Sequence, residues 1–306
     1  MPAPMIALGP EPADWAVEAV RRGGGEPTAD LTAADALVWL SSHGVADLGA
    51  VLDGHARLRW VQLPFAGIEQ VAAAGVVTAE RVWTCAKGCY AEPVAEHALA
   101  LSLAGLRLLP ERVAARSWGG PGGTSLYDRS VVILGGGGIT AELLRLLAPY
   151  RVHATVVRRR ADPVAGAART VPTEALRAVL PGALVVYLAL ALTPATSGII
   201  GAEELACMDR AAWLVNVARG GHVDTDALTA ALAAGTIAGA ALDVTDPEPL
   251  PDGHPLWGLP NAIITPHSAD TPEMVAPLLA DRIRTNVTRF AAGDTLEGLV
   301  DVEAGY

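Results

Sequence analysis

Three side chains in the C-terminal half of the chain could together transfer a proton beside a bound anion. Arg219 lies in the segment Leu-Val-Asn-Val-Ala-Arg-Gly-Gly-His, Glu248 in Thr-Asp-Pro-Glu-Pro-Leu and His267 in Ile-Thr-Pro-His-Ser-Ala-Asp. A hydride that reaches a ketone carbon leaves negative charge on the oxygen, and an imidazolium within hydrogen-bond reach can supply the proton. We expect His267 to be that donor. The planar guanidinium of Arg219 could hold a substrate carboxylate and polarise the neighbouring carbonyl.

Glu248 supplies the third group. A buried carboxylate bonded to the far ring nitrogen would fix the tautomer of the histidine and favour its protonated form. Each of the three residues alone has a purely structural interpretation, such as an arginine that caps a helix or a histidine at a strand end. Together they indicate a site that reduces a 2-oxo acid. Each follows an apolar, strand-like run (residues 213–217, 237–244 and 262–265), and parallel-sheet enzymes place their chemistry in such loops.

The elements that would carry these residues indicate an α/β protein. A chain of 306 residues is long enough for two domains, and its 51% hydrophobic content suits parallel strands covered by helices on both faces. Short apolar strands at residues 5–8, 36–40 and 58–62 predict a small open lobe. A helical stretch at 93–107 and a turn-rich segment then lead to a buried strand at 131–134, which begins a second lobe.

In these motifs the chain resembles the D-isomer-specific 2-hydroxyacid dehydrogenase family, almost continuously from residue 60 to 271. The resemblance implies that Arg219, Glu248 and His267 are the catalytic residues. It also implies two doubly wound parallel-sheet domains, a dinucleotide-binding Rossmann domain and a smaller flavodoxin-like substrate domain, with the active site in a cleft between them. The final helical segment would return to the first lobe. We therefore expect a substrate domain of residues 1–98 and 275–306 and a cofactor domain of residues 99–274.

The cofactor site is expected at Val-Val-Ile-Leu-Gly-Gly-Gly-Gly-Ile-Thr, residues 131–140. A strand that runs into a glycine-rich turn and then a helix brings backbone amides and the positive helix end to a pyrophosphate. Thr140 replaces the third glycine of the dinucleotide fingerprint, which mainly permits close helix packing, so a small threonine is acceptable. The predicted cofactor contacts in this loop are Gly135, Gly137, Gly138 and Ile139. The resemblance adds Thr193, Ala218 and Asp243, the last near the nicotinamide carboxamide.

Arg158 decides which nicotinamide cofactor we expect. About 20 residues past the fingerprint, NAD-binding proteins carry an acidic residue for the ribose 2'-hydroxyl. Here the corresponding strand ends at Arg158, Arg159 and Arg160. Guanidinium groups bind a 2'-phosphate, whereas the alternative interpretation is a solvated basic turn. The sequence thus predicts a preference for NADP(H), with NAD(H) possible.

The first lobe is expected to bind the substrate. Its segment Val-Gln-Leu-Pro-Phe-Ala-Gly-Ile-Glu resembles the family loop whose backbone amides bind the carboxylate, with Ala66 and Gly67 in those positions. Phe65 could line the side-chain pocket or belong to the core. Lys87 and Tyr90 could reach the far end of the substrate, although Lys87, the only lysine of the chain, could equally be a solvated loop residue.

Composition limits the partners. The net charge of −11 argues against a nucleic-acid-binding protein. The longest apolar run, residues 183–192, is too short for the roughly 20 residues of a membrane span, and the N-terminus lacks the pattern of a signal peptide, so we expect a cytoplasmic protein. Three reduced cysteines and no metal site are expected. The resemblance implies a homodimer, and His97 is expected to be a helix residue near the hinge between the lobes.

These observations predict an NAD(P)-dependent D-2-hydroxyacid dehydrogenase. The enzyme would transfer a hydride between NADP(H) and a small 2-oxo acid such as glyoxylate or hydroxypyruvate. A specialised or phosphorylated 2-hydroxy acid is an alternative substrate, which Lys87, Arg57 and Arg59 leave open. A second alternative is a non-catalytic, NAD(P)-sensing interaction protein, because the transcriptional co-repressors of the family can keep all three catalytic residues.

Overall fold

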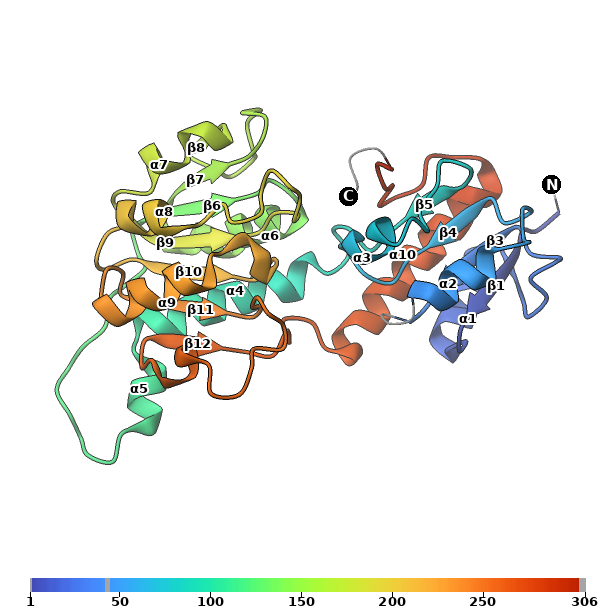
Figure 1. Ribbon diagram of the computed structural model, residues 1–306. Helices are drawn as coiled ribbons and strands as arrows, with labels where there is room; N and C mark the ends of the chain where they lie inside the picture. The colour runs from blue at the N-terminus through green and yellow to red at the C-terminus, as the bar shows by residue number, and fades with distance from the viewer. Residues whose placement is uncertain (1, 42–44, 303–306) are drawn as a thin grey trace. The chain divides into compact units, whose positions relative to one another are not determined.

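The computed structural model describes residues 2–41 and 45–302 and divides into two compact units, each with a parallel sheet (Figure 1). Unit 1 contains the chain up to Tyr90 and from Thr271 onward, and unit 2 is Ala91–Asp270. The sequence-based limits at residues 98 and 274 fall inside the helices α4 (Ala91–Leu106) and α10 (Pro272–Ala292). The difference arises because periodicity identifies a helix but not the unit against which its apolar face packs.

Unit 1 is a five-stranded sheet with helices on both faces. Its elements are β1 (Met5–Gly9), α1 (Asp14–Arg22), β2 (Glu26–Thr28), β3 (Ala36–Trp39), α2 (Val45–Leu52), β4 (Trp60–Gln62), α3 (Glu69–Ala73), β5 (Val82–Thr84) and α10. The strands are parallel in the order β2-β1-β3-β4-β5. This is the strand order of flavodoxin-like proteins, so the predicted class of the smaller domain is confirmed.

Both faces of the unit 1 sheet are covered. α2 and α3 contribute Leu48, Leu52 and Val71 to the core on one face. On the other face α10 brings the Phe290 ring to 5.2 Å from that of Trp60, measured between centroids. The chain therefore returns from unit 2 to complete unit 1, as the resemblance implied.

Unit 2 is a seven-stranded sheet. Its strands are β6 (Ser130–Leu134), β7 (His153–Val157), β8 (Arg169–Val171), β9 (Ala183–Leu188), β10 (Trp213–Asn216), β11 (Gly239–Leu242) and β12 (Ala262–Ile264). Its helices are α4, α5 (Leu109–Ala114), α6 (Gly138–Leu147), α7 (Leu176–Val179), α8 (Ala202–Cys207) and α9 (Thr225–Ala234). All seven strands are parallel, in the order β12-β11-β10-β9-β6-β7-β8. From β6 the chain adds β7 and β8 on one side of the sheet and then adds β9 to β12 on the other side. Doubly wound dinucleotide-binding folds have this order.

Trp213 fills the space between α4 and the sheet of unit 2. A Cβ built on Gly105 of α4 would lie 2.5 Å from the indole, and a Cβ on Gly239 of β11 would also lie 2.5 Å from it. The Trp213 ring therefore fits because both positions are glycine, and a larger side chain at either position would displace it. Tyr187 of β9 adds a buried hydrogen bond of 2.9 Å to Ser102 of α4.

The carboxyl ends of the parallel strands position the candidate site. The glycine-rich turn follows β6, Arg219 follows β10, Asp243 follows β11 and His267 follows β12. Because these strands run in one direction, the four segments leave the sheet at the same edge. Among the described residues, no helix is both long and apolar enough to cross a membrane.

Gly105→Ala is expected to lower the free energy of unfolding by about 1 to 3 kcal/mol, because the added methyl overlaps the Trp213 ring in a close-packed core. Urea unfolding measures the change. The control is Trp213→Leu, which costs stability by itself but removes the obstacle. In that background Gly105→Ala should be neutral or stabilising by up to about 1 kcal/mol, since alanine is the better helix residue. Equal losses in both backgrounds would contradict the packing argument.

Candidate active site

Residues 135–138 form the turn between β6 and α6. Gly135 has φ of 108°, and a Cβ there would lie 2.1 Å from the carbonyl oxygen of Ala189, so only glycine fits this backbone and this close approach. α6 begins at Gly138 without a side-chain cap, and no atom lies within 4 Å of a Cβ built on Gly137. Uncapped helix amides beside open space fit the phosphates of a dinucleotide.

Thr140 closes this turn. The residue is fully buried, and its hydroxyl donates to the carbonyl oxygen of Gly135 at 3.0 Å. A glycine at this position could not make that hydrogen bond. The departure from the fingerprint therefore adds a contact across the turn while fitting the packing of α6.

Arg158 lies against the glycine-rich turn. Its amide donates to the Val171 carbonyl oxygen at 3.1 Å, which extends the pairing of β7 with β8. A Cβ built on Gly136 would lie 3.1 Å from Arg158 Cδ and 3.2 Å from its Nε. Arg159 and Arg160 are exposed, and Arg160 pairs with Asp162 at 3.3 Å. Arg158 is thus the arginine of the three that packs along the turn.

The Arg219 turn is held by buried neighbours. Asn216 donates from Nδ2 to the Arg219 carbonyl oxygen at 2.9 Å and accepts from the Ala218 amide at 3.0 Å. Nδ1 of the buried His222 lies 2.9 Å from the same carbonyl oxygen. The half-buried Arg219 guanidinium donates to the Ala218 carbonyl oxygen at 2.7 Å. These contacts fix the backbone from which Arg219 projects.

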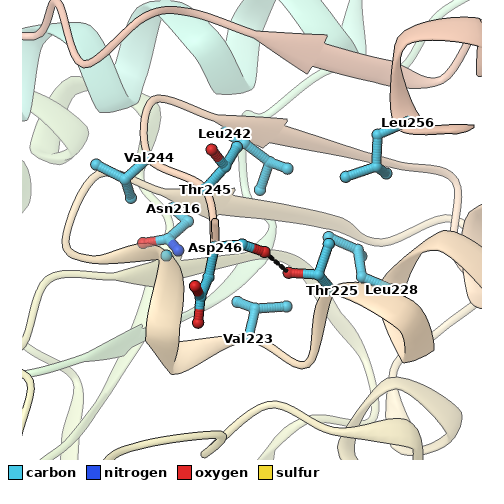
Figure 2. Close-up of a pocket in the computed structure, with 10 residues that line it drawn as sticks. Asn216, Val223, Thr225, Leu228, Leu242, Val244, Thr245, Asp246 and Leu256 are labelled. Carbon is cyan, nitrogen blue, oxygen red and sulfur yellow. Dashed lines mark hydrogen bonds between the residues drawn. The ribbon is translucent and has the colours of Figure 1, made fainter. Parts of the chain in front are cut away.

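The Arg219 turn packs on the loop that carries Glu248. A Cβ built on Gly220 would lie 1.9 Å from the carbonyl oxygen of Thr245, so the two backbones touch. Figure 2 shows the Thr225 hydroxyl donating to the Asp246 carbonyl oxygen, at 2.7 Å. A cavity of about 10 Å³ remains beside this contact, which is room for about one water molecule. The guanidinium and the carboxylate therefore come from two loops that are directly joined.

The Glu248 and His267 side chains are in direct contact. Glu248 Oε1 lies 2.6 Å from His267 Nδ1, which leaves Nε2 as the ring nitrogen that can exchange a proton with a substrate. The Glu248 and His267 side chains are 41% and 45% exposed, whereas a buried carboxylate was expected from the sequence.

Asp243 anchors the loop that presents His267. Its buried carboxylate accepts from the Thr265 hydroxyl at 2.5 Å, the Ser268 amide at 2.9 Å and the Ala269 amide at 3.0 Å. Burial alone would raise the pKa of Asp243, but these hydrogen bonds and one from His97 outweigh it and lower the pKa to about 2. The carboxylate is therefore ionised at neutral pH, and its oxygens accept hydrogen bonds from groups of the protein itself.

The backbone of His267 is in an uncommon conformation. Its φ is 50°, and its amide donates to the carbonyl oxygens of Asp243 and Thr265 at 2.8 and 3.0 Å. A side chain with positive φ persists where neighbouring contacts enforce it, often at functional sites. Half-buried Asp270 follows in the same loop; burial raises its pKa, while the charges of His267 and Arg219 act to lower it.

Unit 1 carries the residues predicted to contact the substrate. Ala66 is exposed and Gly67 half-buried in the loop after β4, while Phe65 packs partly against the core of the unit. Tyr90 is buried, and its hydroxyl donates to the carbonyl oxygen of Pro64. Tyr90 thus supports the loop that holds Ala66 and Gly67.

Lys87 is exposed, and its Nζ donates to the Leu299 carbonyl oxygen at 3.4 Å. Arg282 of α10 donates to the carbonyl oxygens of Cys85 and Lys87 at 3.0 and 3.2 Å. This segment is therefore held against α10.

Thr193, another predicted cofactor contact, is half-buried, and its amide donates to the Thr196 hydroxyl at 2.8 Å.

The residues that hold the site in place were not predicted from the sequence. Asn216 brackets the Arg219 turn, and Thr265 and His97 contact Asp243. Asn216 could have been found as a polar residue that ends an apolar strand, because a buried polar group needs partners. Nothing in the sequence links His97 to Asp243, which is far away along the chain.

The sequence of the chain matches a known protein family. Residues 98–269 match the family described as D-isomer specific 2-hydroxyacid dehydrogenase, NAD binding domain. An uncharacterized protein of Corynebacterium melassecola is 43% identical over 256 residues, covering 82% of this chain and 84% of that protein. A glyoxylate/hydroxypyruvate reductase A of Serratia proteamaculans is 35% identical over 178 residues. That match covers 58% of this chain but only 56% of the reductase.

The fold also matches solved structures. A D-isomer specific 2-hydroxyacid dehydrogenase from Xanthobacter autotrophicus Py2, in complex with NADPH and MES, superposes with a TM-score of 0.84. Its sequence is 27% identical, and the match covers 99% of this chain and all of that protein.

Asp243→Asn is expected to lower the free energy of unfolding by an amount that depends on pH. The folded pKa of about 2 lies below the ordinary value of 3.8, so the ionised group contributes roughly 2 kcal/mol above pH 4. This contribution disappears as the pH falls from about 4 to 2. Urea unfolding at pH 7 and pH 2.5 should therefore show a difference between wild type and variant that shrinks with acid.

Asp270→Asn is the matched control, with the opposite sign. Because burial raises the pKa of Asp270, its charge opposes folding at neutral pH, and protonation favours the native state. The variant should be as stable as wild type or more stable at pH 7. A difference between wild type and Asp243→Asn that stayed constant down to pH 2.5 would contradict the role of its ionised carboxylate.

Proposed function

This chain belongs to the D-isomer-specific 2-hydroxyacid dehydrogenase family, and from that premise we propose that it reduces small 2-oxo acids with NADPH. Membership makes it an oxidoreductase that uses a nicotinamide cofactor. The observation that carries the proposal is the contact of 2.6 Å between His267 and Glu248, on loops at the same sheet edge as Arg219. It provides a proton donor near a guanidinium that can bind a carboxylate.

In the proposed reaction, Arg219 binds the carboxylate of the 2-oxo acid and polarises its carbonyl. His267 donates a proton from Nε2 to the carbonyl oxygen, and Glu248 stabilises the imidazolium before that transfer. The nicotinamide cofactor, when bound, supplies the hydride. In the oxidising direction His267 accepts the proton from the hydroxyl. Unit 1 is proposed to contribute the amides of Ala66 and Gly67 as further ligands of the carboxylate.

The cofactor would be held by the turn after β6. The uncapped amides at Gly138 and Ile139 would bind its phosphates, and Arg158 and Arg159 would bind a 2'-phosphate. The position of Arg158 along Gly136 supports this assignment. The presence of NADPH in the Xanthobacter structure supports it as well.

Glyoxylate and hydroxypyruvate are the proposed substrates. The similarity to the glyoxylate/hydroxypyruvate reductase A of Serratia proteamaculans supports them. A specialised or phosphorylated 2-hydroxy acid is the alternative within the same chemistry. We also propose a homodimer, because unit 2 exposes apolar side chains in and after α5, among them Val113 at 80% and Trp118 at 100%. Exposed apolar side chains that are close along the chain support an interface in this segment.

The activity is tested by NADPH and NADH oxidation against a panel of 2-oxo acids that includes phosphorylated members. Wild type should turn over glyoxylate or hydroxypyruvate. His267→Asn should lower kcat by about 100- to 10,000-fold, the contribution of a positioned general acid. It should still bind NADPH, as measured by fluorescence titration. Turnover only with a phosphorylated acid would favour the specialised substrate, and NADPH binding without any turnover would favour the non-catalytic alternative.

Arg158→Asp should change the cofactor preference. Loss of a charge-assisted hydrogen bond, with a new charge that repels the 2'-phosphate, should reduce the ratio of kcat/KM for NADPH to that for NADH by about 10-fold or more. Arg160→Asp is the matched control, because Arg160 is exposed and pairs with Asp162. An unchanged ratio in Arg158→Asp, or an equal change in both variants, would contradict the assignment.

A further inference from the structure

His97 contacts the anchor of the catalytic loop from outside that loop. It lies in α4, and its Nε2 is 3.3 Å from Asp243 Oδ1 and 3.1 Å from Thr265 Oγ1. The His97 side chain is 23% exposed and that of Asp243 is 1% exposed. The contact therefore links a helix on one face of the unit 2 sheet to the carboxyl ends of β11 and β12.

The partners of His97 determine which nitrogen carries its hydrogen. The ionised Asp243 carboxylate can only accept. The Thr265 hydroxyl donates its single hydrogen to Asp243 Oδ1 at 2.5 Å, so towards His97 it too can only accept. His97 must therefore carry a hydrogen on Nε2 and donate it to this pair.

The same carboxylate holds the backbone on the far side of His267. Asp243 Oδ1 and Oδ2 accept from the amides of Ser268 and Ala269, and the His267 amide donates to the Asp243 carbonyl oxygen. Thr265 attaches the loop on the near side. The direction of the Asp243 carboxylate thus sets the course of the backbone that carries the proton donor.

We propose that His97 is a positioning residue for His267: by donating from Nε2 to Asp243 and Thr265, it fixes the loop from Thr265 to Ala269 in place. Every residue of this network belongs to unit 2. All of the hydrogen bonds named here are therefore formed within unit 2. The catalytic part of this inference rests on the function proposed above, whereas the part that concerns the order of the loop does not.

Three variants test the inference. His97→Leu removes the donor, and His97→Gln places an amide N–H near the position of the imidazole Nε2. Tyr187→Phe is the matched control, because it removes a buried hydrogen bond of 2.9 Å between α4 and β9 that does not touch the loop. Equal losses of thermal stability in His97→Leu and Tyr187→Phe would show that the two substitutions perturb α4 similarly.

Amide hydrogen exchange of the peptide that spans residues 265–270 is measured in the cofactor-free protein. In His97→Leu, exchange at His267, Ser268 and Ala269 should be about tenfold faster, as expected for loss of a hydrogen bond to a charged group. It should stay at the wild-type rate in Tyr187→Phe and approach that rate in His97→Gln. With the best 2-oxo acid, kcat should fall by roughly 10- to 100-fold in His97→Leu and largely recover in His97→Gln.

Unchanged exchange in His97→Leu would overturn the proposal, and so would faster exchange spread evenly over unit 2. Faster loop exchange with an unchanged kcat would overturn its catalytic part. If wild type reduces no 2-oxo acid, the proposed function fails, while the exchange measurement still decides whether His97 orders the loop.

Discussion

The buried carboxylate of Asp243 is the interaction on which the candidate site depends. An ionised group is tolerated in the interior only when hydrogen bonds replace its hydration. Here the donors come from a loop hydroxyl, two loop amides and the His97 imidazole. The hydrogen bonds that stabilise the Asp243 charge therefore also hold the loop in place. This loop includes His267 with its uncommon backbone conformation.

Close backbone approach is the second constraint. Gly135 lies against Ala189, and Gly220 lies against Thr245, at distances that exclude any Cβ. The first contact shapes the turn whose α6 amides are proposed to bind a phosphate, and the second joins the Arg219 and Glu248 loops. In both places the absence of a Cβ lets two backbone segments at the sheet edge approach each other closely. The chemistry of the site is built on these contacts between main chains.

The ligands proposed for the site are anions, although the chain as a whole is acidic, with a net charge of −11. Groups close to a bound anion determine the electrostatic potential that it meets, because charges beyond about 10 Å are largely screened at physiological salt. The uncapped end of α6, Arg158 at the glycine-rich turn and the Arg219 guanidinium each present local hydrogen-bond donors. Half-buried Asp270 carries the opposite charge, and burial raises its pKa.

Much of the site could be predicted from the sequence. The apolar runs that end in Arg219, Asp243 and His267 became the parallel strands β10, β11 and β12, because strand formation depends on local patterns. The glycine-rich turn was recognisable for the same reason. Residue type and position at a strand end therefore sufficed to identify the groups that could do chemistry.

Only the tertiary structure decided which residues hold those groups. The contacts of His97 with Asp243, of Gly220 with Thr245 and of Trp213 with Gly105 join residues distant along the chain. The unit to which α4 belongs and the half-exposed state of Glu248 depend on packing as well. Such contacts arise when helices and strands pack in three dimensions, and no local pattern records the partner that a side chain will meet there.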